Sequence, residues 1–329
     1  MFSAIYIEEE VVESQRVKEI LARLPDLPIT VCKRYGEIFN RNKQNFRLQK
    51  RAPALILAKK YGRHVLPTPG GYGFNQQRSF YFSHMLNCIY DCRYCFLQGM
   101  YRSANALLFV NYEDFESALI EEISRSSEAS VYYSGYDCDS LALEPVSRFC
   151  EYYLPVFARF PQATLEIRTK STQIRSLLEQ APLPNCVIAM SFTPHESSVK
   201  WESKVPAIAK RIEALYKLQK AGWRIALRFE PVLFGAESEL EYLRLFEEIF
   251  SKLDASKIHS VSTGLFRMPT DYFKNIVKLY PDEPLFARET VSSNGLIGLR
   301  HEQEAQLLQQ IEQRLLGFIS MQQYYRCAS

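Results

Sequence analysis

Three cysteines in the first third of the chain are spaced closely enough to serve one site. Cys88, Cys92 and Cys95 form the pattern C-x3-C-x2-C. Three soft thiolates in so short a segment suit an iron–sulfur cluster. A structural zinc site usually has four ligands, and no further Cys or His follows at the spacing of a zinc finger. The pattern therefore predicts a [4Fe–4S] cluster with one iron that lacks a protein ligand. Three buried structural thiols are the alternative.

An iron without a protein ligand makes this pattern resemble that of the radical S-adenosylmethionine superfamily. Tyr94, immediately before the last cysteine, is an aromatic residue of the kind usual there. The resemblance implies that the methionine amine and carboxylate of S-adenosylmethionine bind the open iron. Electron transfer then cleaves the cofactor to a 5′-deoxyadenosyl radical. We expect Tyr94 and Phe96 to lie against this cofactor.

Alternating short β-rich runs and longer amphipathic stretches must position this site. They favour an α/β fold with a parallel sheet covered by helices, and a parallel barrel or partial barrel fits best. The resemblance then implies a partial parallel (β/α)6 barrel of the radical S-adenosylmethionine type. An open, doubly wound sheet is the alternative, because periodicity does not separate the two. The expected strands are residues 79–83, 129–134, 164–168, 187–191, 225–230 and 260–265. The expected helices are residues 112–124, 145–160, 172–179, 205–220, 237–252 and 270–278.

In a parallel barrel, the chemistry lies at the C-terminal ends of the strands. Gly135, Asp139 and Ser140 follow the second expected strand. A glycine lets the backbone approach a ligand, and the polar side chains can bond to a zwitterion. Lys170 and Ser191 end the third and fourth strands, and Lys170 could meet a carboxylate or a ribose oxygen. We predict that these five residues bind the cofactor.

Segments on either side of the barrel are expected to flank it. Residues 1–75 are predicted to form an N-terminal basic extension, with a helix over 11–24 and an irregular stretch over 28–73. Between Lys33 and Arg63 there are ten Lys or Arg and one acidic residue, which indicates a phosphate-binding surface or an ordinary solvated face. The core is expected over 76–283. Residues 284–329 should form a hairpin, whose Asn294-Gly295 pair favours a tight turn, and then a helix over 301–316.

Bulk composition agrees with an ordinary globular protein. The chain has 329 residues, 47% of them hydrophobic and 23% charged, with a net charge of +3. No run of about 18 apolar residues indicates a membrane span. Eight cysteines without an export signal fit a metal site in a reducing cytoplasm better than a disulfide framework.

Several segments together resemble the spore photoproduct lyase family of DNA repair enzymes. The cysteine segment, residues 87–99, reads NCIYDCRYCFLQG. The other matching segments lie at residues 139–144, 168–171, 191–194, 202, 209–214 and 221–222. The resemblance covers roughly residues 68–265, most of the expected core.

The resemblance implies a partial barrel with one [4Fe–4S] cluster and one S-adenosylmethionine. In the lyase, the adenosyl radical takes a hydrogen atom from a crosslinked thymine dimer in DNA. The crosslink then fragments in a carbon–carbon lyase reaction, and a nearby cysteine returns a hydrogen atom. The cofactor is thought to be regenerated. Damaged DNA is then the implied partner, and an electron donor such as flavodoxin or ferredoxin is expected.

The sequence departs from the family at the position of the hydrogen donor. The lyase reads Cys-Thr-Ser-Asp at the end of the second strand. With Asp139 and Lys170 as anchors, Tyr136 falls on the cysteine position and Cys138 on the serine position. A count from Cys95 without a gap instead puts Cys138 on the donor position. Cys138 and Tyr136 are therefore the candidate catalytic residues, and a buried spectator thiol is the alternative for Cys138.

A second departure leaves the substrate open. The lyase hairpin is rich in Arg and Tyr, whereas residues 286–300 here contain two Arg and no Tyr. One alternative is a radical enzyme that acts on an RNA base, a peptide or a small molecule. Another is a non-catalytic nucleic-acid-binding protein that carries a cluster. The remaining cysteines, at positions 32, 150, 186 and 327, have no informative spacing and are expected to be core or surface thiols.

Overall fold

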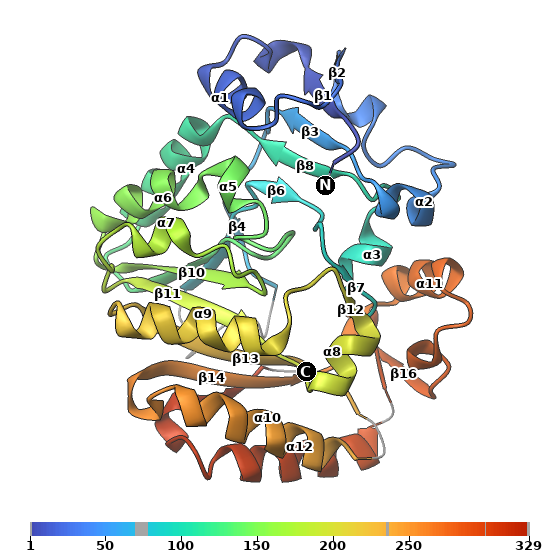
Figure 1. Cartoon of the computed structure of the whole chain (residues 1–329), viewed down its shortest axis with the longest axis vertical. Helices are drawn as coiled ribbons and strands as arrows, with labels where there is room; N and C mark the ends of the chain where they lie inside the picture. The colour runs from blue at the N-terminus through green and yellow to red at the C-terminus, as the bar shows by residue number, and fades with distance from the viewer. Residues whose placement is uncertain (1, 70–77, 235–236, 300, 328–329) are drawn as a thin grey trace.

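The computed structural model describes residues 2–69, 78–234, 237–299 and 301–327. An eight-stranded sheet forms its centre, in the order β18-β14-β13-β11-β10-β9-β5-β4 (Figure 1). All neighbouring pairs from β5 to β18 are parallel, and β4 joins β5 antiparallel. The strands are β4 (Leu66–Pro67), β5 (Arg78–Tyr81), β9 (Ser130–Tyr133), β10 (Ala163–Thr169), β11 (Cys186–Ser191), β13 (Arg224–Val232), β14 (Ile258–Leu265) and β18 (Tyr324–Arg326).

This sheet confirms the predicted partial barrel. The six expected strands correspond to β5, β9, β10, β11, β13 and β14, and they lie in chain order within the sheet. Sequential order with parallel pairing distinguishes a curled half-barrel from a doubly wound sheet, whose order reverses at a switch point. Central strands such as β11 are buried throughout and read as continuous apolar runs because helices cover them.

Helices connect the strands, as the periodicity predicts. They are α4 (Tyr112–Ser124), α5 (Glu144–Ser147), α6 (Phe149–Ala158), α7 (Arg175–Leu178), α9 (Ile208–Lys220), α10 (Ser238–Lys252) and α11 (Thr270–Leu279). The expected helix over 145–160 is divided in two at Arg148, whose φ of 50° is left-handed and ends α5. Among the described residues, no helix is both long and apolar enough to cross a membrane.

A second sheet of five strands contains the N-terminal segment. Its order is β2-β1-β3-β8-β6, and the strands are β1 (Ile5–Glu8), β2 (Ile29–Cys32), β3 (Leu55–Ala58), β6 (Met85–Leu86) and β8 (Ala106–Phe109). Helix α1 (Gln15–Arg23) confirms most of the predicted first helix. The prediction that residues 28–73 are irregular was wrong, because β2, α2 (Phe46–Arg51), β3 and β4 all lie there. The four-residue run of β3 is completely buried, and its brevity within a basic stretch conceals it in the sequence.

The two sheets share the chain around the cysteines. Strand β6 ends at Leu86, two residues before Cys88, and β8 begins at Ala106, shortly after the cysteine motif. The cysteine loop is therefore an excursion between two strands of the N-terminal sheet. The predicted domain boundary between residues 75 and 76 lies outside the described residues, and these domain limits stay a prediction.

The C-terminal segment forms the predicted hairpin and helix. Strands β16 (Thr290–Ser293) and β17 (Leu296–Leu299) pair antiparallel, and β15 (Arg267–Pro269) joins β17. Asn294 and Gly295 both have positive φ, at 50° and 76°, as a type I′ turn requires. Helix α12 (His301–Leu315) follows. The short strand β18, which returns to the main sheet beside β14, is absent from the sequence prediction.

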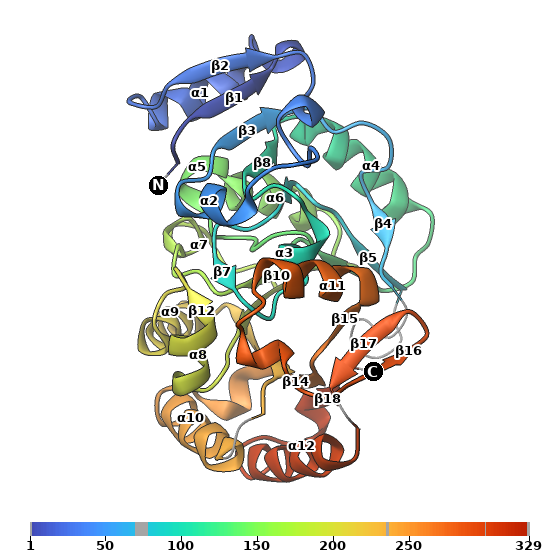
Figure 2. The same cartoon turned by 90° about the vertical axis from the view of Figure 1, so that its right-hand side faces the viewer.

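Helix α11 packs tightly against α3 (Leu97–Met100), the short helix that follows the last cysteine (Figure 2). A Cβ atom on Gly99 would overlap the Tyr272 carbonyl group and lie 2.9 Å from Ile276 Cγ1. Asn275 donates to the Gly99 carbonyl oxygen at 2.9 Å. This glycine therefore lets the C-terminal segment close over the cysteine loop.

Gly99→Ala should lower the free energy of unfolding by about 1–3 kcal/mol, because the added methyl group meets rigid backbone. Chemical denaturation of the cluster-free protein measures this change. Gly36→Ala is the matched control, since nothing lies within 4 Å of a Cβ there and it should change stability by less than about 0.5 kcal/mol. Equal denaturation midpoints for the two variants would contradict this account.

Candidate active site

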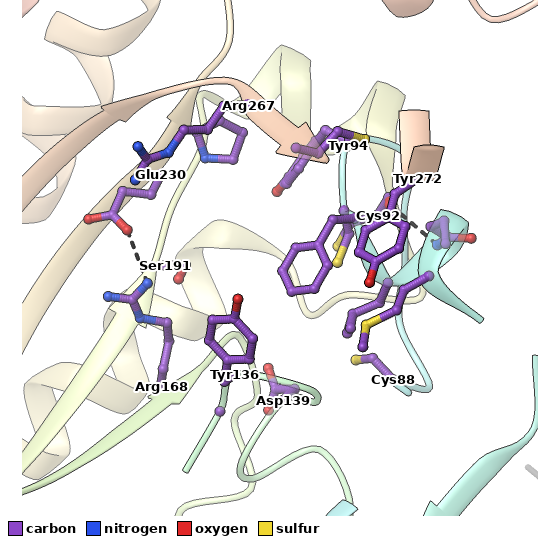
Figure 3. A pocket seen from close by; sticks show the side chains of 18 of the residues that line it. Cys88, Cys92, Tyr94, Tyr136, Asp139, Arg168, Ser191, Glu230, Arg267 and Tyr272 are labelled. Atoms are coloured by element: carbon purple, nitrogen blue, oxygen red, sulfur yellow. Dashed lines mark hydrogen bonds and ion pairs between the residues drawn. The ribbon is translucent and has the colours of Figure 1, made fainter. Parts of the chain in front are cut away.

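A cavity of about 480 Å³ opens at the C-terminal edge of the main sheet. Its lining includes Cys88, Cys92 and Cys95. The ends of β9, β10, β11, β13 and β14 also contribute lining residues. Figure 3 shows Cys88 and Cys92 on one side of this cavity, opposite Arg168 and Glu230. The structure thus brings the cysteine motif and the predicted strand-end residues to one place.

Hydrogen bonds fix the start of the cysteine loop. Asn87 has a positive φ of 70°, which turns the chain out of β6. Its amide donates to the carbonyl oxygens of Ser103 and Asn105, at 2.8 and 3.1 Å, and its Oδ1 accepts from the Cys88 N–H at 2.9 Å. Lys50 of α2 donates to the Cys88 carbonyl oxygen at 2.7 Å. The N-terminal segment therefore supports the first cysteine directly.

The middle of the loop is held by a two-residue ladder. Strand β7 (Asp91–Cys92) pairs antiparallel with β12 (Glu202–Ser203). Gln98 donates to Asp91 Oδ1 at 2.9 Å and to the Cys92 carbonyl oxygen at 3.3 Å. These bonds fix the backbone on both sides of Cys92, so the thiols have defined directions before any ligand binds.

The donor set fits an iron–sulfur cluster. Burial raises the pKa of the Cys88 thiol to about 12, and it also raises the pKa of Cys92 and Cys95. Cluster irons displace such thiol protons when they bind. No group of three Cys, His, Asp or Glu side chains in the described part of the chain is arranged around a single ion. A cubane needs no such arrangement, because its three thiolates bind three different irons.

A buried ion pair anchors Tyr94 and β12. Glu202 accepts from the Tyr94 hydroxyl, from Ser198 Oγ at 2.8 Å and from Arg211 Nη2 at 2.7 Å. Glu202 and Arg211 side chains are completely buried. Burial alone would raise the pKa of Glu202, but Lys170 and Arg211 lower it below its usual value. The carboxylate is therefore ionised, and Lys170 Nζ lies 4.0 Å from it.

Asp139 ties two strand ends together. Its Oδ1 accepts from Thr169 Oγ1 at 2.6 Å, and its Oδ2 accepts from the Lys170 N–H at 2.6 Å. Gly135 lies beside them, where a Cβ would be 2.7 Å from the Arg168 carbonyl oxygen and 2.8 Å from Ser140 Oγ. The glycine is thus required by close approach of the chain, and Asp139 sets the direction of Lys170.

The other predicted residues lie in different surroundings. Ser191 lines the cavity at the end of β11. Ser140 does not line it, because its buried hydroxyl bonds to Ser134 Oγ at 2.8 Å. Cys138 lines the cavity but is only 5% exposed, and its thiol donates to the Ser134 carbonyl oxygen at 3.6 Å. Its pKa is raised well above the usual value, mainly by burial.

Aromatic side chains form a layer across the cavity. Tyr136 lies against Tyr81 and Phe96, with ring centroids 4.5 and 5.8 Å away. Phe96 stacks in turn on Tyr272 of α11, at 6.4 Å and an interplanar angle of 16°. Tyr136 and Tyr272 are labelled in Figure 3. Burial raises the pKa of Tyr136 to about 12, so its hydroxyl is protonated at neutral pH.

The wall opposite the cysteines is charged, and most of it was missed from sequence. Arg168 lies between Glu166 at 3.2 Å and Glu230 at 3.0 Å. Arg267 donates to Cys327 Sγ at 3.7 Å. These side chains come from β10, β13, the first residue of β15 and the residue after β18, which lie far apart in the sequence. In the sequence, the only indication that these residues line the site is their position at or near the ends of strands.

Comparison with known proteins agrees with this architecture. A family model described as spore photoproduct lyase matches residues 80–306. The chain belongs to the spore photoproduct lyase family. It is therefore a radical S-adenosylmethionine enzyme of the lyase class, whose cofactors are a [4Fe–4S] cluster and S-adenosylmethionine. The predictions of family, fold, enzyme class and cofactors are confirmed.

Solved structures of spore photoproduct lyase have the same fold. One is a double mutant with bound AdoMet and dinucleoside spore photoproduct, at a TM-score of 0.85 and 16% identity. Another is complexed with dinucleoside spore photoproduct, at a TM-score of 0.84 and 15% identity. Each match covers 100% of this chain and 98% of the other. A search of curated proteins finds no match.

Glu202→Ala should lower the free energy of unfolding by about 3–5 kcal/mol, because it leaves the buried Arg211 without its charge partner. Glu213→Ala on α9 is the matched control, since Glu213 is 44% exposed beside Lys217 and should cost less than about 1 kcal/mol.

The stability lost in the Glu202→Ala variant should also depend on pH. The pKa of Glu202 is lower in the folded protein than in the unfolded chain, where it is about 4.3. The ionised carboxylate therefore contributes its full share to the free energy of unfolding above that pH, and this contribution declines as the pH falls toward the folded-state pKa. Denaturation at several pH values checks this, and a wild-type advantage that grew in acid would contradict it.

Proposed function

We propose that this family member repairs a crosslinked thymine pair in DNA by radical fragmentation. One observation carries the proposal: the three thiols, the strand-end residues and an aromatic layer line a single cavity. Its volume of about 480 Å³ is in the usual range for ligand sites, roughly 300–1,000 Å³. Relatives with the same fold bind dinucleoside spore photoproduct.

In this proposal, Cys88, Cys92 and Cys95 hold the cluster and the strand ends hold S-adenosylmethionine. The cofactor, when bound, supplies the 5′-deoxyadenosyl radical. The Lys170 ammonium would pair with the cofactor carboxylate, and Ser191 Oγ would bond to a ribose oxygen. Gly135 leaves room for the cofactor, while Tyr94 and Phe96 form an apolar boundary. Asp139 acts through Lys170, and Ser140 is not part of the proposed site.

Substrate recognition would use the aromatic layer and the charged wall. Flat faces of Tyr136 and Phe96 can stack on a pyrimidine that has left the helix. Arg168 and Arg267 line the same cavity and can attract a phosphate or a base carbonyl group. The hairpin β16–β17 lacks the tyrosine expected for a wedge, and it exposes Val291 and Leu296 instead.

Part of the basic N-terminal stretch stabilises the fold and is not proposed to bind DNA. Arg34 and Lys59 pair with Glu10, and Lys50 is buried beneath Cys88. Exposed cations that could meet DNA phosphates are Arg41, Lys43, Arg47, Arg51 and Arg63. We propose DNA as partner through these side chains, and a flavodoxin or ferredoxin as electron donor.

We also propose that the enzyme works in the cytoplasm. None of the eight cysteines, all of which lie in the described residues, is paired in a disulfide, and this agrees with a reducing compartment.

Reconstituted enzyme with reductant and S-adenosylmethionine should convert dinucleoside spore photoproduct to its two thymine residues, and without the lesion it should release 5′-deoxyadenosine slowly. Anaerobic incubation and chromatography measure both products. Cys92→Ala should form neither. If 5′-deoxyadenosine appears but the lesion survives, a different substrate, such as an RNA base, a peptide or a small molecule, is favoured. If the wild-type enzyme forms neither product, the proposal is wrong.

Anaerobically reconstituted protein should contain about four irons per chain, as a cubane requires. Cys92→Ala should lose them because one of three ligands is missing. Cys32→Ala is the control, since this thiol lies on β2, outside the cavity lining. Iron analysis with absorption spectroscopy measures the content. A full cubane in the Cys88, Cys92 and Cys95 triple alanine variant would contradict the ligand assignment.

Lys170→Ala should weaken S-adenosylmethionine binding by about 1–3 kcal/mol, the loss expected for one charged hydrogen bond. Equilibrium binding to the oxidised holoenzyme measures the affinity, so no turnover is needed. Lys217→Ala, at an exposed position on α9, should leave affinity unchanged. The same affinity in both variants would remove Lys170 from the site.

A further inference from the structure

The cavity raises the question of which residue returns the hydrogen atom. Tyr136 occupies the family's cysteine position in the anchored alignment. Cys138 is the nearest thiol in sequence, but it is 5% exposed, belongs to the main hydrophobic core and donates to Ser134. A second non-ligand thiol among the lining residues is that of Cys327.

Strand β18 fixes Cys327 at the edge of the sheet. The Cys327 N–H donates to the Thr263 carbonyl oxygen at 2.8 Å, which continues the parallel pairing of β18 with β14. Tyr324 and Arg326 of the same strand bond to Glu312 of α12. The backbone that carries the Cys327 thiol is therefore held from two sides.

The neighbours of Cys327 belong to the charged wall of the cavity. A Cβ on Gly264 would lie 3.3 Å from Cys327 Cβ and 3.3 Å from Glu230 Cγ, so the glycine lets these two side chains approach the strand closely. Arg267 donates to the sulfur at 3.7 Å. The Arg267 N–H is the donor in this contact, so the sulfur is the acceptor.

The protonation state of Cys327 suits hydrogen-atom transfer, which needs a thiol rather than a thiolate. Burial and Glu230 raise the pKa of Cys327 to about 11, against the lowering effect of nearby arginines. At neutral pH the sulfur therefore keeps its hydrogen. An S–H bond is weaker than the C–H bond that it would form, so the transfer is downhill.

We infer that Cys327 is the hydrogen-atom donor of this enzyme, on the opposite wall of the cavity from the cluster cysteines. The fragmented substrate radical takes one hydrogen atom from Cys327: a C–H bond forms, the S–H bond breaks, the carbon radical is reduced and the sulfur becomes a thiyl radical. A hydrogen atom from 5′-deoxyadenosine would restore the thiol and give back the 5′-deoxyadenosyl radical, and re-formation of S-adenosylmethionine would have to drive this uphill step. Atoms and electrons balance without another reagent.

This inference rests on the proposed function, and solvent deuterium tests it. The thiol hydrogen exchanges with D2O, so repair of dinucleoside spore photoproduct in D2O should give a product with one deuterium in wild type. Cys327→Ala should still form 5′-deoxyadenosine, but it should lose the deuterium and accumulate adducts. Cys327→Ser keeps the size of the side chain and should behave likewise. Mass spectrometry of the products measures this.

Variants of the other candidates are the matched controls. Cys138→Ala and Tyr136→Phe should keep the deuterium in the product. If Cys327→Ala keeps it, or if either control loses it, Cys327 is not the donor.

A second measurement needs no lesion. Reduced enzyme should cleave S-adenosylmethionine slowly without substrate, and the radical should then take a hydrogen atom from a cavity neighbour. In D2O this 5′-deoxyadenosine should contain deuterium in wild type and much less in Cys327→Ala. If the wild type does not repair the lesion, the proposed function fails, and this comparison still decides the place of Cys327. Equal deuterium in both proteins would overturn it.

A third measurement needs no radical chemistry. Without reductant, bound dinucleoside spore photoproduct should slow alkylation of Cys327 by iodoacetamide, as followed by peptide mass spectrometry. Lesion binding is monitored in the same samples. Unchanged alkylation of Cys327 under saturating lesion would contradict a position against the substrate.

Discussion

The tethering of the cysteine loop is the constraint on which the rest of the site depends. Strands β6 and β8 of the N-terminal sheet hold its two ends, and the β7–β12 ladder holds its middle. A loop with so many fixed points presents its thiols with little entropy left to lose when a cluster binds. The N-terminal sheet is therefore part of the active-site support, although its first strands lie far from the cavity.

Buried charges complete this support. Glu202 with Arg211 fixes β12 behind Tyr94, and Glu166 with Arg228 joins β10 to β13 at 2.8 Å inside the half-barrel. Buried pairs contribute little net stability compared with apolar side chains, but removal of one partner is costly. We interpret them as devices that specify one arrangement of strand ends. Arg168 extends the second pair to Glu230 at the cavity wall.

Local patterns in the sequence predict the main sheet, the connecting helices, the hairpin and the cysteine motif, because each of these depends on residues that are close together in the chain. Two kinds of feature escape them. Short strands such as β3 and β18 depend on partners distant in the chain. The charged wall of Arg168, Glu230, Arg267 and Cys327 exists only because four separate strand ends converge. Ser140 shows the reverse case, a strand-end residue whose side chain faces Ser134.

Strand β8 pairs with β3 on one edge and with β6 on the other, so the protein cannot be divided between β3 and β8 without exposing an edge of the sheet. The β8 residues Ala106–Phe109 are buried. Removal of the segment up to β3 would bare a row of unpaired amide and carbonyl groups beside a flat apolar surface. Such an edge recruits strands from other molecules. Shortened forms of the chain should therefore self-associate, and the apparent extension acts as a cover against aggregation.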